Sequence, residues 1–168
     1  MPKIKKEDLI WAAGLFDGEG CISLSKRTPQ RLNKAVSYNY ALILKVAMCH
    51  KDTVMRLHRM FGVGTLHNQR LQAAHLSRAW IWFCNRDDAE IVIHKLRPWL
   101  FTKARDAELA LQFLSLPPMQ KGGRWRSRPV SPELEAKRNR LFLKLRNCKS
   151  RNMSMARKER YENQVSGN

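Results

Sequence analysis

Two carboxylates, Asp17 and Glu19, alternate with two glycines, Gly18 and Gly20, near the start of the chain. Carboxylate oxygens are ligands that Mg²⁺ takes in proteins, usually one or two of them beside phosphates and water. Apolar residues recur at helical spacing over residues 8–17, which predicts a helix that the glycines end through a left-handed C-cap. The carboxylates would then lie at the negative end of the helix dipole, where they are disfavoured. Such a conflict is expected at a functional site, although an ordinary helix-to-turn junction has the same pattern.

Small residues in the middle of this helix, Ala12, Ala13 and Gly14, predict a face that another backbone approaches closely. The nine residues of the segment Ala12–Gly20, AAGLFDGEG, resemble the LAGLIDADG motif of homing endonucleases and related intron-encoded proteins. In that family two such helices pack along their small-residue faces, and their acidic ends jointly hold divalent metal ions over DNA. Without the resemblance, the spacing shows only a helix with a crowded face and an acidic end.

The resemblance implies roles for five residues. Glu19 aligns with the metal-binding acid of the family, and the backbone carbonyl of Gly18 is the neighbouring ligand. Asp17 either contacts metal or forms hydrogen bonds at the helix end. Lys103 aligns with the active-site lysine, which stabilises phosphate charge or orients water, or it is a solvated residue at a helix start. His50 stands at a strand end where the family more often has Gln, so it either positions water or is merely a polar strand-end residue.

Only one copy of the motif occurs in the 168 residues, so a partner helix must come from a second copy of the chain. We therefore expect a two-fold symmetric homodimer, in which the two Glu19 side chains meet across the axis. The expected interface residues are Ala12, Ala13, Gly14, Phe16 and Asp17. The family resemblance implies two or three Mg²⁺ ions for each dimer active site, with Mn²⁺ as a substitute.

The formal net charge of +18 and an isoelectric point near 10.5 point to a polyanionic partner, most simply nucleic acid. A membrane is not expected, because no apolar run reaches the roughly 18 residues that a transmembrane helix needs. The four cysteines are scattered and form no C-x-x-C pair, which argues against a zinc site or a disulfide framework. We expect a protein that is not secreted and that works in the cytoplasm, or in an organelle matrix if it is organelle-encoded.

Periodicity predicts alternating helices and strands after the first helix. Strands are expected at 21–26, 36–49, 65–71 and 76–84, with helices at 52–61, 88–97 and 103–116. This order gives an α+β fold, the αββαββα core of the LAGLIDADG homing endonucleases, with an antiparallel four-stranded saddle sheet and helices packed on one face, plus C-terminal helices. Residues 1–118 are expected to form that core domain. Residues 119–168 carry 14 Lys or Arg against 4 Glu, and are expected to be a basic linker, a helix and a flexible tail.

The open face of the sheet is the expected DNA surface, because a two-stranded ribbon fits the major groove. Polar side chains on or beside the strands are the candidate DNA contacts: Ser23, Ser25, Arg27, Arg31, Asn33, Lys34, Tyr38, Tyr40, Lys45, His67, Gln69, Arg78 and Trp80. Most of them have an equally good interpretation as solvated strand residues. The strand that holds Trp80 and Trp82 is apolar at successive positions, so its covered face cannot be determined from the sequence.

The function expected from these patterns is a homodimeric, site-specific DNA endonuclease. It would cleave both strands of a long pseudo-palindromic double-stranded DNA site by metal-dependent phosphodiester hydrolysis, leaving 3′ overhangs. The alternative is an intron maturase or a non-cleaving DNA-binding protein of the same fold. A ribosome-associated RNA-binding protein would also be basic, but that function does not explain Glu19 or the small-residue helix.

Overall fold

The computed structural model describes residues 4–27, 38–69, 78–117 and 131–151. The elements are α1 (Lys6–Glu19), β1 (Gly20–Arg27), β2 (Asn39–Met48), α2 (Lys51–Phe61), β3 (Thr65–Gln69), β4 (Ala79–Cys84), α3 (Arg86–Leu96), the 3-10 turn η2 (Arg97–Trp99), α4 (Ala104–Leu114) and α5 (Pro132–Arg151). The predicted αββαββα order is confirmed, with α4 and α5 following it.

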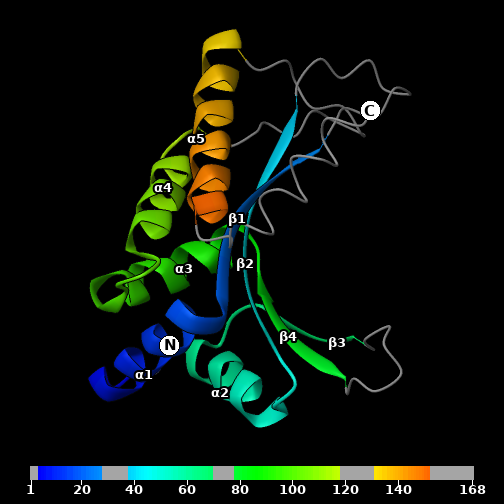
Figure 1. The fold of residues 1–168 in the computed structure, drawn as a ribbon, viewed down its shortest axis with the longest axis vertical. Coiled ribbons are helices and arrows are strands. Elements are labelled where there is room, and N and C mark those ends of the chain that lie inside the picture. Colours follow the sequence, from blue (N-terminus) through cyan, green and yellow to red (C-terminus); the bar gives the residue numbers. More distant parts are fainter. Residues whose placement is uncertain (1–3, 28–37, 70–77, 118–130, 152–168) are drawn as a thin grey trace.

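The four strands form one antiparallel sheet in the order β1-β2-β4-β3. Gly20 pairs with Val46, and Val46 pairs with Trp82, so β2 and β4 are the central strands. The helices lie on one side of this sheet (Figure 1). The predicted α+β fold with two hairpins and helices on one face is therefore confirmed.

The helix-covered face of the sheet carries the core. Alternate residues of β2, namely Tyr40, Leu42, Leu44 and Val46, are buried as the period-2 pattern predicts. On β4 the indole of Trp82 is 1% exposed and stacks on Phe61 with 5.4 Å between ring centroids. Its Nε1–H donates to the Val63 carbonyl at 2.9 Å, so the polar edge of the ring is satisfied.

The junction between α1 and β1 differs from the sequence prediction. The helix continues through Gly18 to Glu19, and Gly20 is extended at φ −73° and ψ 156° rather than left-handed. Gly20 is needed for a different reason, because a Cβ there would lie 2.5 Å from both the ring and the carbonyl oxygen of Phe16. The glycine allows the chain to leave the helix directly into the strand while Phe16 fills the core beneath it.

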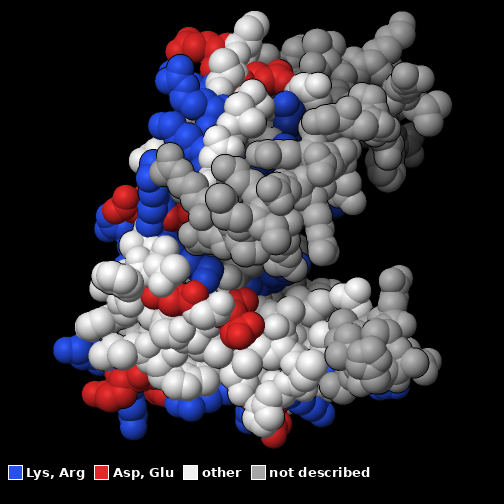
Figure 2. Space-filling model, in the orientation of Figure 1, with Lys and Arg blue, Asp and Glu red and all other residues white. Residues whose placement is uncertain are grey.

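The C-terminal helix α5 lies beside α4 and β1 (Figure 1). Leu141 and Leu145 are 8% and 1% exposed and belong to the same hydrophobic core as the sheet. The linker expected at 121–128 and most of the expected tail, residues 152–168, lie outside the described residues. None of the described helices is long and apolar enough to cross a membrane. Figure 2 shows Lys and Arg side chains gathered mainly along the left side and the lower edge of the view, with groups of acidic side chains between them.

Candidate functional site

The C-terminal end of α1 is held by the carboxylate of Asp17. Its Oδ2 accepts the backbone N–H of Phe101 at 2.7 Å, and its Oδ1 accepts the backbone N–H of Lys103 at 2.9 Å. Both oxygens are therefore engaged with the turn that precedes α4. Of the two roles left open for Asp17 by the sequence, the structure uses the hydrogen-bonding role, and this makes Asp17 a poor direct metal ligand.

The side chain of Lys103 contacts the same end of α1. Its side-chain ammonium donates to the backbone carbonyl of Asp17, which is one of the last carbonyls of α1. A cation is favoured there, because the terminal carbonyls of a helix carry partial negative charge. The structure thus brings the Lys103 ammonium next to Gly18 and within two residues of Glu19.

Glu19 ends α1 with its side chain exposed. Gly18 beside it is also exposed, and a Cβ built at Gly18 meets nothing within 4 Å. No group of three or more His, Cys, Asp or Glu that could hold a metal occurs among the described residues. Among the described residues, the end of α1 therefore offers the Glu19 carboxylate and an accessible backbone at Gly18, and Mg²⁺ takes few protein ligands beside phosphate and water.

His50 lies directly before α2, past the end of β2. It is the residue before the first turn of that helix, and its Nδ1 is 2.8 Å from the Thr53 Oγ1. Since Gly20 pairs with Val46, His50 is four residues past the junction and beyond the end of β2. Its contact with Thr53 is the one that the structure describes for the His50 ring, and its role in positioning water stays a prediction. His50 occupies the N-cap position of α2, and Asp52 is the second residue inside the helix.

The predicted dimer interface is wrong in most of its residues. Ala12, Ala13 and Phe16 are 0%, 0% and 1% exposed within a single chain, because they form the side of α1 that faces the sheet. Asp17 is engaged as described above. Among the predicted residues only Gly14 lies on the free side of the helix, where a Cβ would meet nothing within 4 Å.

That free side of α1 has its own pattern, which the sequence analysis did not identify. Ile10 is 46% exposed, and Gly14 and Gly18 follow it at intervals of four residues. Residues four apart lie one above another on a helix, so these three form a single stripe. Phe101, in the turn held by Asp17, is 91% exposed. The spacing of Gly14 and Gly18 was the available signal, but the sequence could not tell which side of the helix the core covers.

Strand pairing places the candidate DNA contacts on one face or the other of the sheet, because paired residues share a face. Six candidates lie on the face opposite the helices, where their side chains are half-buried or exposed: Ser23, Ser25, Arg27, Lys45, His67 and Gln69. The same face also carries Ile43, Thr65, Ile81 and Phe83, which the sequence analysis missed. The apolar members of this set can contact thymine methyl groups in a major groove.

Other candidates do not lie on that face. Tyr40 is 5% exposed on the covered face, and Trp80 pairs with Met48 and packs against the core, so both predictions are wrong. Tyr38 lies before β2, with the Lys26 ammonium 3.9 Å from its ring centroid. Arg78 is exposed just ahead of β4. The candidates in the segment between β1 and β2, Arg31, Asn33 and Lys34, lie outside the described residues.

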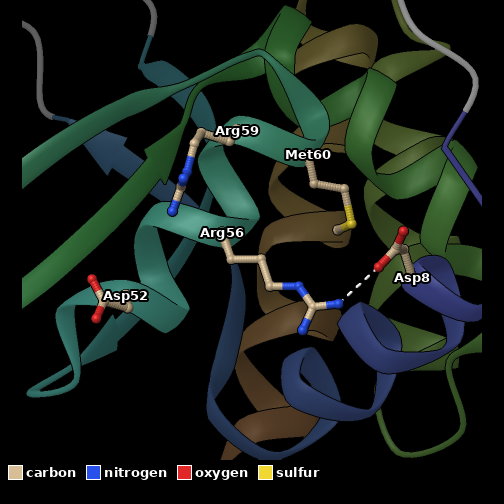
Figure 3. Close-up of a pocket in the computed structure, with 5 residues that line it drawn as sticks. All are labelled: Asp8, Asp52, Arg56, Arg59 and Met60. Atoms are coloured by element: carbon tan, nitrogen blue, oxygen red, sulfur yellow. Dashed lines mark hydrogen bonds and ion pairs between the residues drawn. The ribbon is translucent and has the colours of Figure 1, made fainter.

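A separate open depression of about 540 Å³ lies between α1 and α2 (Figure 3). Its lining residues are Asp8, Asp52, Arg56, Arg59 and Met60. Arg56 donates to the Asp8 carboxylate at 2.8 Å, and its guanidinium lies 4.0 Å from the ring centroid of Trp11. Asp8 is near the opposite end of α1 from Glu19, roughly 16 Å away along a helix that rises 1.5 Å per residue. This cluster joins the two helices and is not part of the site at Glu19.

Comparison with known proteins places this geometry in a known fold. No protein-family model matches the sequence, and no curated protein matches it. Among solved structures, the homing endonuclease I-CvuI, in complex with its target and in the presence of calcium, is 20% identical with a TM-score of 0.66 over 84% of this chain and 82% of that one. The homing endonuclease I-TnaI is 18% identical with a TM-score of 0.55, over 98% of this chain and 99% of its own. The LAGLIDADG homing endonuclease I-SmaMI, bound to cleaved DNA, is 15% identical with a TM-score of 0.60, over 84% of this chain and 45% of that one.

The fold is therefore that of the LAGLIDADG homing endonucleases. Two of the three structures are matched over most of their own length, whereas this chain spans less than half of I-SmaMI. The element order, the single antiparallel four-stranded sheet and the position of the AAGLFDGEG segment at the end of α1 all agree with the fold predicted from the motif.

Proposed function

We propose that this chain is a single-motif member of the LAGLIDADG homing endonuclease family, and that it cleaves double-stranded DNA at a specific site. The observation that carries the proposal is the end of α1, where exposed Glu19 follows, by two residues, the Asp17 carbonyl that accepts the Lys103 ammonium. An acid and a cation at one solvent-facing point, on a chain of net charge +18, suit a phosphodiester as substrate.

A homodimer completes the site in this proposal. One chain presents one free carboxylate at the helix end, and a two-fold axis along the free side of α1 would bring a second Glu19 beside it. The stripe of Ile10, Gly14 and Gly18 supports such a contact, because residues without side chains let two helix backbones approach closely. We propose this stripe as the interface in place of Ala12, Ala13 and Phe16, which the core covers.

The free face of the sheet is the proposed DNA surface. Arg27 and Lys45 supply positive charge there, and Ser23, Ser25 and Gln69 can donate and accept hydrogen bonds at base edges. Two such faces related by a two-fold axis would read two half-sites of opposite orientation. A long pseudo-palindromic target follows from that symmetry, and double-strand cleavage with 3′ overhangs is the outcome expected of this family.

Within the site each residue has a separate task. Glu19 and the Gly18 carbonyl would hold Mg²⁺, and Mn²⁺ in its place, with two or three ions for each dimer; the bound metal supplies an activated water and neutralises phosphate charge. The Lys103 ammonium adds fixed positive charge near the developing negative charge of the phosphate. Asp17 is a positioning residue, because it holds the turn from which Lys103 extends.

The decisive experiment compares the wild type with Glu19→Gln and with Glu90→Gln, a matched change on the exposed side of α3. The proteins are incubated with a pooled library of random DNA duplexes and Mg²⁺, and cleaved and bound duplexes are sequenced separately. We expect the wild type and Glu90→Gln to cleave one family of sequences. Glu19→Gln should bind the same sequences without cutting them, and cleavage retained by this variant would refute the catalytic assignment.

A maturase or non-cleaving DNA-binding protein is the second candidate. It is favoured by His50, which stands at the strand end where the family more often has Gln and whose Nδ1 lies 2.8 Å from the Thr53 hydroxyl at the start of α2. In the same experiment this function predicts selective binding without any cleaved product from the wild type.

A further inference from the structure

Helix α5 is hydrogen-bonded to the ends of β1 and β2 through one side chain, Asn139. Its Oδ1 accepts a hydrogen bond from the Lys26 ammonium at 2.9 Å and another from the Tyr40 hydroxyl at 3.3 Å. Lys26 and Tyr40 are a register pair at the far ends of the two strands, so a single amide oxygen joins both strands to the helix.

Three further contacts surround this junction. The Glu135 carboxylate accepts the backbone N–H of Tyr38 at 3.3 Å. The Lys26 ammonium lies 3.9 Å from the ring centroid of Tyr38. Phe142 meets the ring of Tyr40 edge-on, with 6.2 Å between centroids. Helix α5 therefore contacts the hairpin end over two turns, at positions 135, 139 and 142.

The hydrogen bonds at this junction indicate that Asn139 positions Lys26 and Tyr40 and does more than bury surface area. Burial raises the pKa of Tyr40, so its hydroxyl remains a donor at neutral pH. An apolar side chain at position 139 would bury area equally well, as Leu141 and Leu145 already do on the same helix. The amide oxygen instead fixes where two donors lie, and hydrogen bonds to a charged donor such as Lys26 are the stronger kind.

The consequence appears on the other face of the same strands. Successive residues of a strand point to opposite faces, so Lys26 faces α5 while Arg27 and Ser25 face away from the helices. A shift of the Lys26–Tyr40 pair therefore moves Arg27 as well. This end of β1 lies seven residues from Gly20, roughly 23 Å from the catalytic junction at about 3.3 Å per residue.

We propose that Asn139 is a positioning residue that sets base preference at the outer positions of each DNA half-site, by fixing the ends of β1 and β2 from the helix side. The inference rests on the proposed function, since it assumes that the open face of the sheet reads DNA. It assigns α5 a part in specificity, although its contacts described above lie on the covered side of the sheet.

The test compares three variants with the wild type. Asn139→Leu removes the acceptor with little change in size, Asn139→Asp retains an acceptor for both donors, and Lys144→Ala changes an exposed residue of the same helix. Base preference is measured by selection from the random duplex library. Backbone amide hydrogen exchange is measured at positions 26, 27, 39 and 40 in the free proteins.

We expect Asn139→Leu to weaken discrimination at the outer base pairs, where a base change that lowers wild-type cleavage about tenfold should lower its cleavage only about twofold. Preference near the scissile phosphates should stay within about twofold of the wild type, and amides at the strand ends should exchange faster. Asn139→Asp should restore most of the outer preference, and Lys144→Ala should match the wild type.

A uniform loss of activity in Asn139→Leu, with base preference unchanged at every position, would overturn the positioning role and leave only a structural one. If the wild type selects a site and Asn139→Leu selects it with the same outer preference, the inference alone fails. If the wild type neither binds nor cleaves any sequence, the proposed function fails and the inference fails with it.

Discussion

Asp17 and Lys103 bind each other in both directions. The carboxylate of Asp17 accepts the backbone N–H of Lys103 at 2.9 Å, while the Lys103 ammonium donates to the backbone carbonyl of Asp17. The residues are 86 positions apart in the chain, and their two bonds attach the end of α1 to the start of α4. Because Gly18 and Glu19 directly follow Asp17, this attachment fixes the end of α1, where the candidate catalytic residues lie, relative to Lys103.

Replacing Asp17 tests the attachment. Asp17→Ala removes the acceptor for two backbone N–H groups, and bonds to a charged acceptor contribute roughly 1.5–3 kcal/mol each when well made. Because the site is partly exposed, we expect a loss of about 2 kcal/mol in the free energy of unfolding, measured by urea denaturation. Asp17→Asn, which keeps one acceptor oxygen, should lose about half as much.

The control for this change is Asp52→Ala, which removes an exposed carboxylate in the first turn of α2 and should cost well under 1 kcal/mol. Cleavage should fall in Asp17→Ala even under conditions where the variant is fully folded, because Lys103 loses its fixed position. An Asp17→Ala protein that is folded and cleaves like the wild type would show that the attachment does not serve the site.

Two glycines of the motif, Gly14 and Gly20, should respond in opposite ways to the same substitution. Gly20→Ala places a Cβ 2.5 Å from the Phe16 ring and carbonyl, so we expect it to be destabilising by several kcal/mol or to prevent folding. Gly14→Ala meets nothing within 4 Å in one chain and should stabilise an isolated subunit by up to about 1 kcal/mol, the difference in helix propensity.

Gly14→Leu separates subunit stability from association. A leucine at this position is tolerated by one subunit but would hold two helices apart at the stripe of Ile10, Gly14 and Gly18. We expect a folded protein with native circular dichroism that sediments as a monomer and no longer cleaves both strands, whereas the wild type sediments as a dimer. A Gly14→Leu protein that remains a dimer would move the interface away from this side of α1.

Much of the fold can be predicted from the spacing of apolar residues and from the Gly and Pro residues that end helices and strands. Leu42, Leu44 and Val46 alternate with exposed positions on β2, so a single strand reveals which face is covered. The strand β4 gives no such signal, because Trp80, Ile81, Trp82 and Phe83 are apolar on both faces. Only the pairing of Val46 with Trp82 determines its orientation, and pairing depends on residues far apart in the chain.

In the candidate site, too, the contacts between residues far apart in the chain could not be predicted from the sequence. The motif locates Glu19, and the family resemblance locates Lys103, but neither shows that Asp17 holds the two together. The sequence also does not show which side of α1 is exposed, because the apolar residues Leu9, Ile10, Ala13 and Phe16 lie on several sides of the helix. Packing decides it: Phe16 fills the space under Gly20, and this turns Gly14 toward solvent.

Burial of Cys84 predicts a specific loss of stability in alkaline solution. Its side chain is fully buried on β4, and burial raises the pKa of the thiol to about 12, with a smaller contribution from the negative charge of Asp88. In the unfolded chain the thiol titrates near its ordinary value of about 8.5–9. Between these two pKa values the folded protein holds a proton that the unfolded chain has lost, so the free energy of unfolding falls as pH rises, by up to about 1.4 kcal/mol per pH unit.

The measurement is urea denaturation of the wild type and of Cys84→Ala at pH 8 and pH 10. Lysine and tyrosine titration affects both proteins equally, so the difference between them isolates the thiol. We expect the wild type to lose about 1.4 kcal/mol more than Cys84→Ala between the two pH values. Below pH 8 the difference between the proteins should be constant, since the thiol is then protonated in both states. Equal losses at pH 10 would mean that the thiol ionises in the folded protein about as easily as in the unfolded chain, and that water reaches β4 from the helix side.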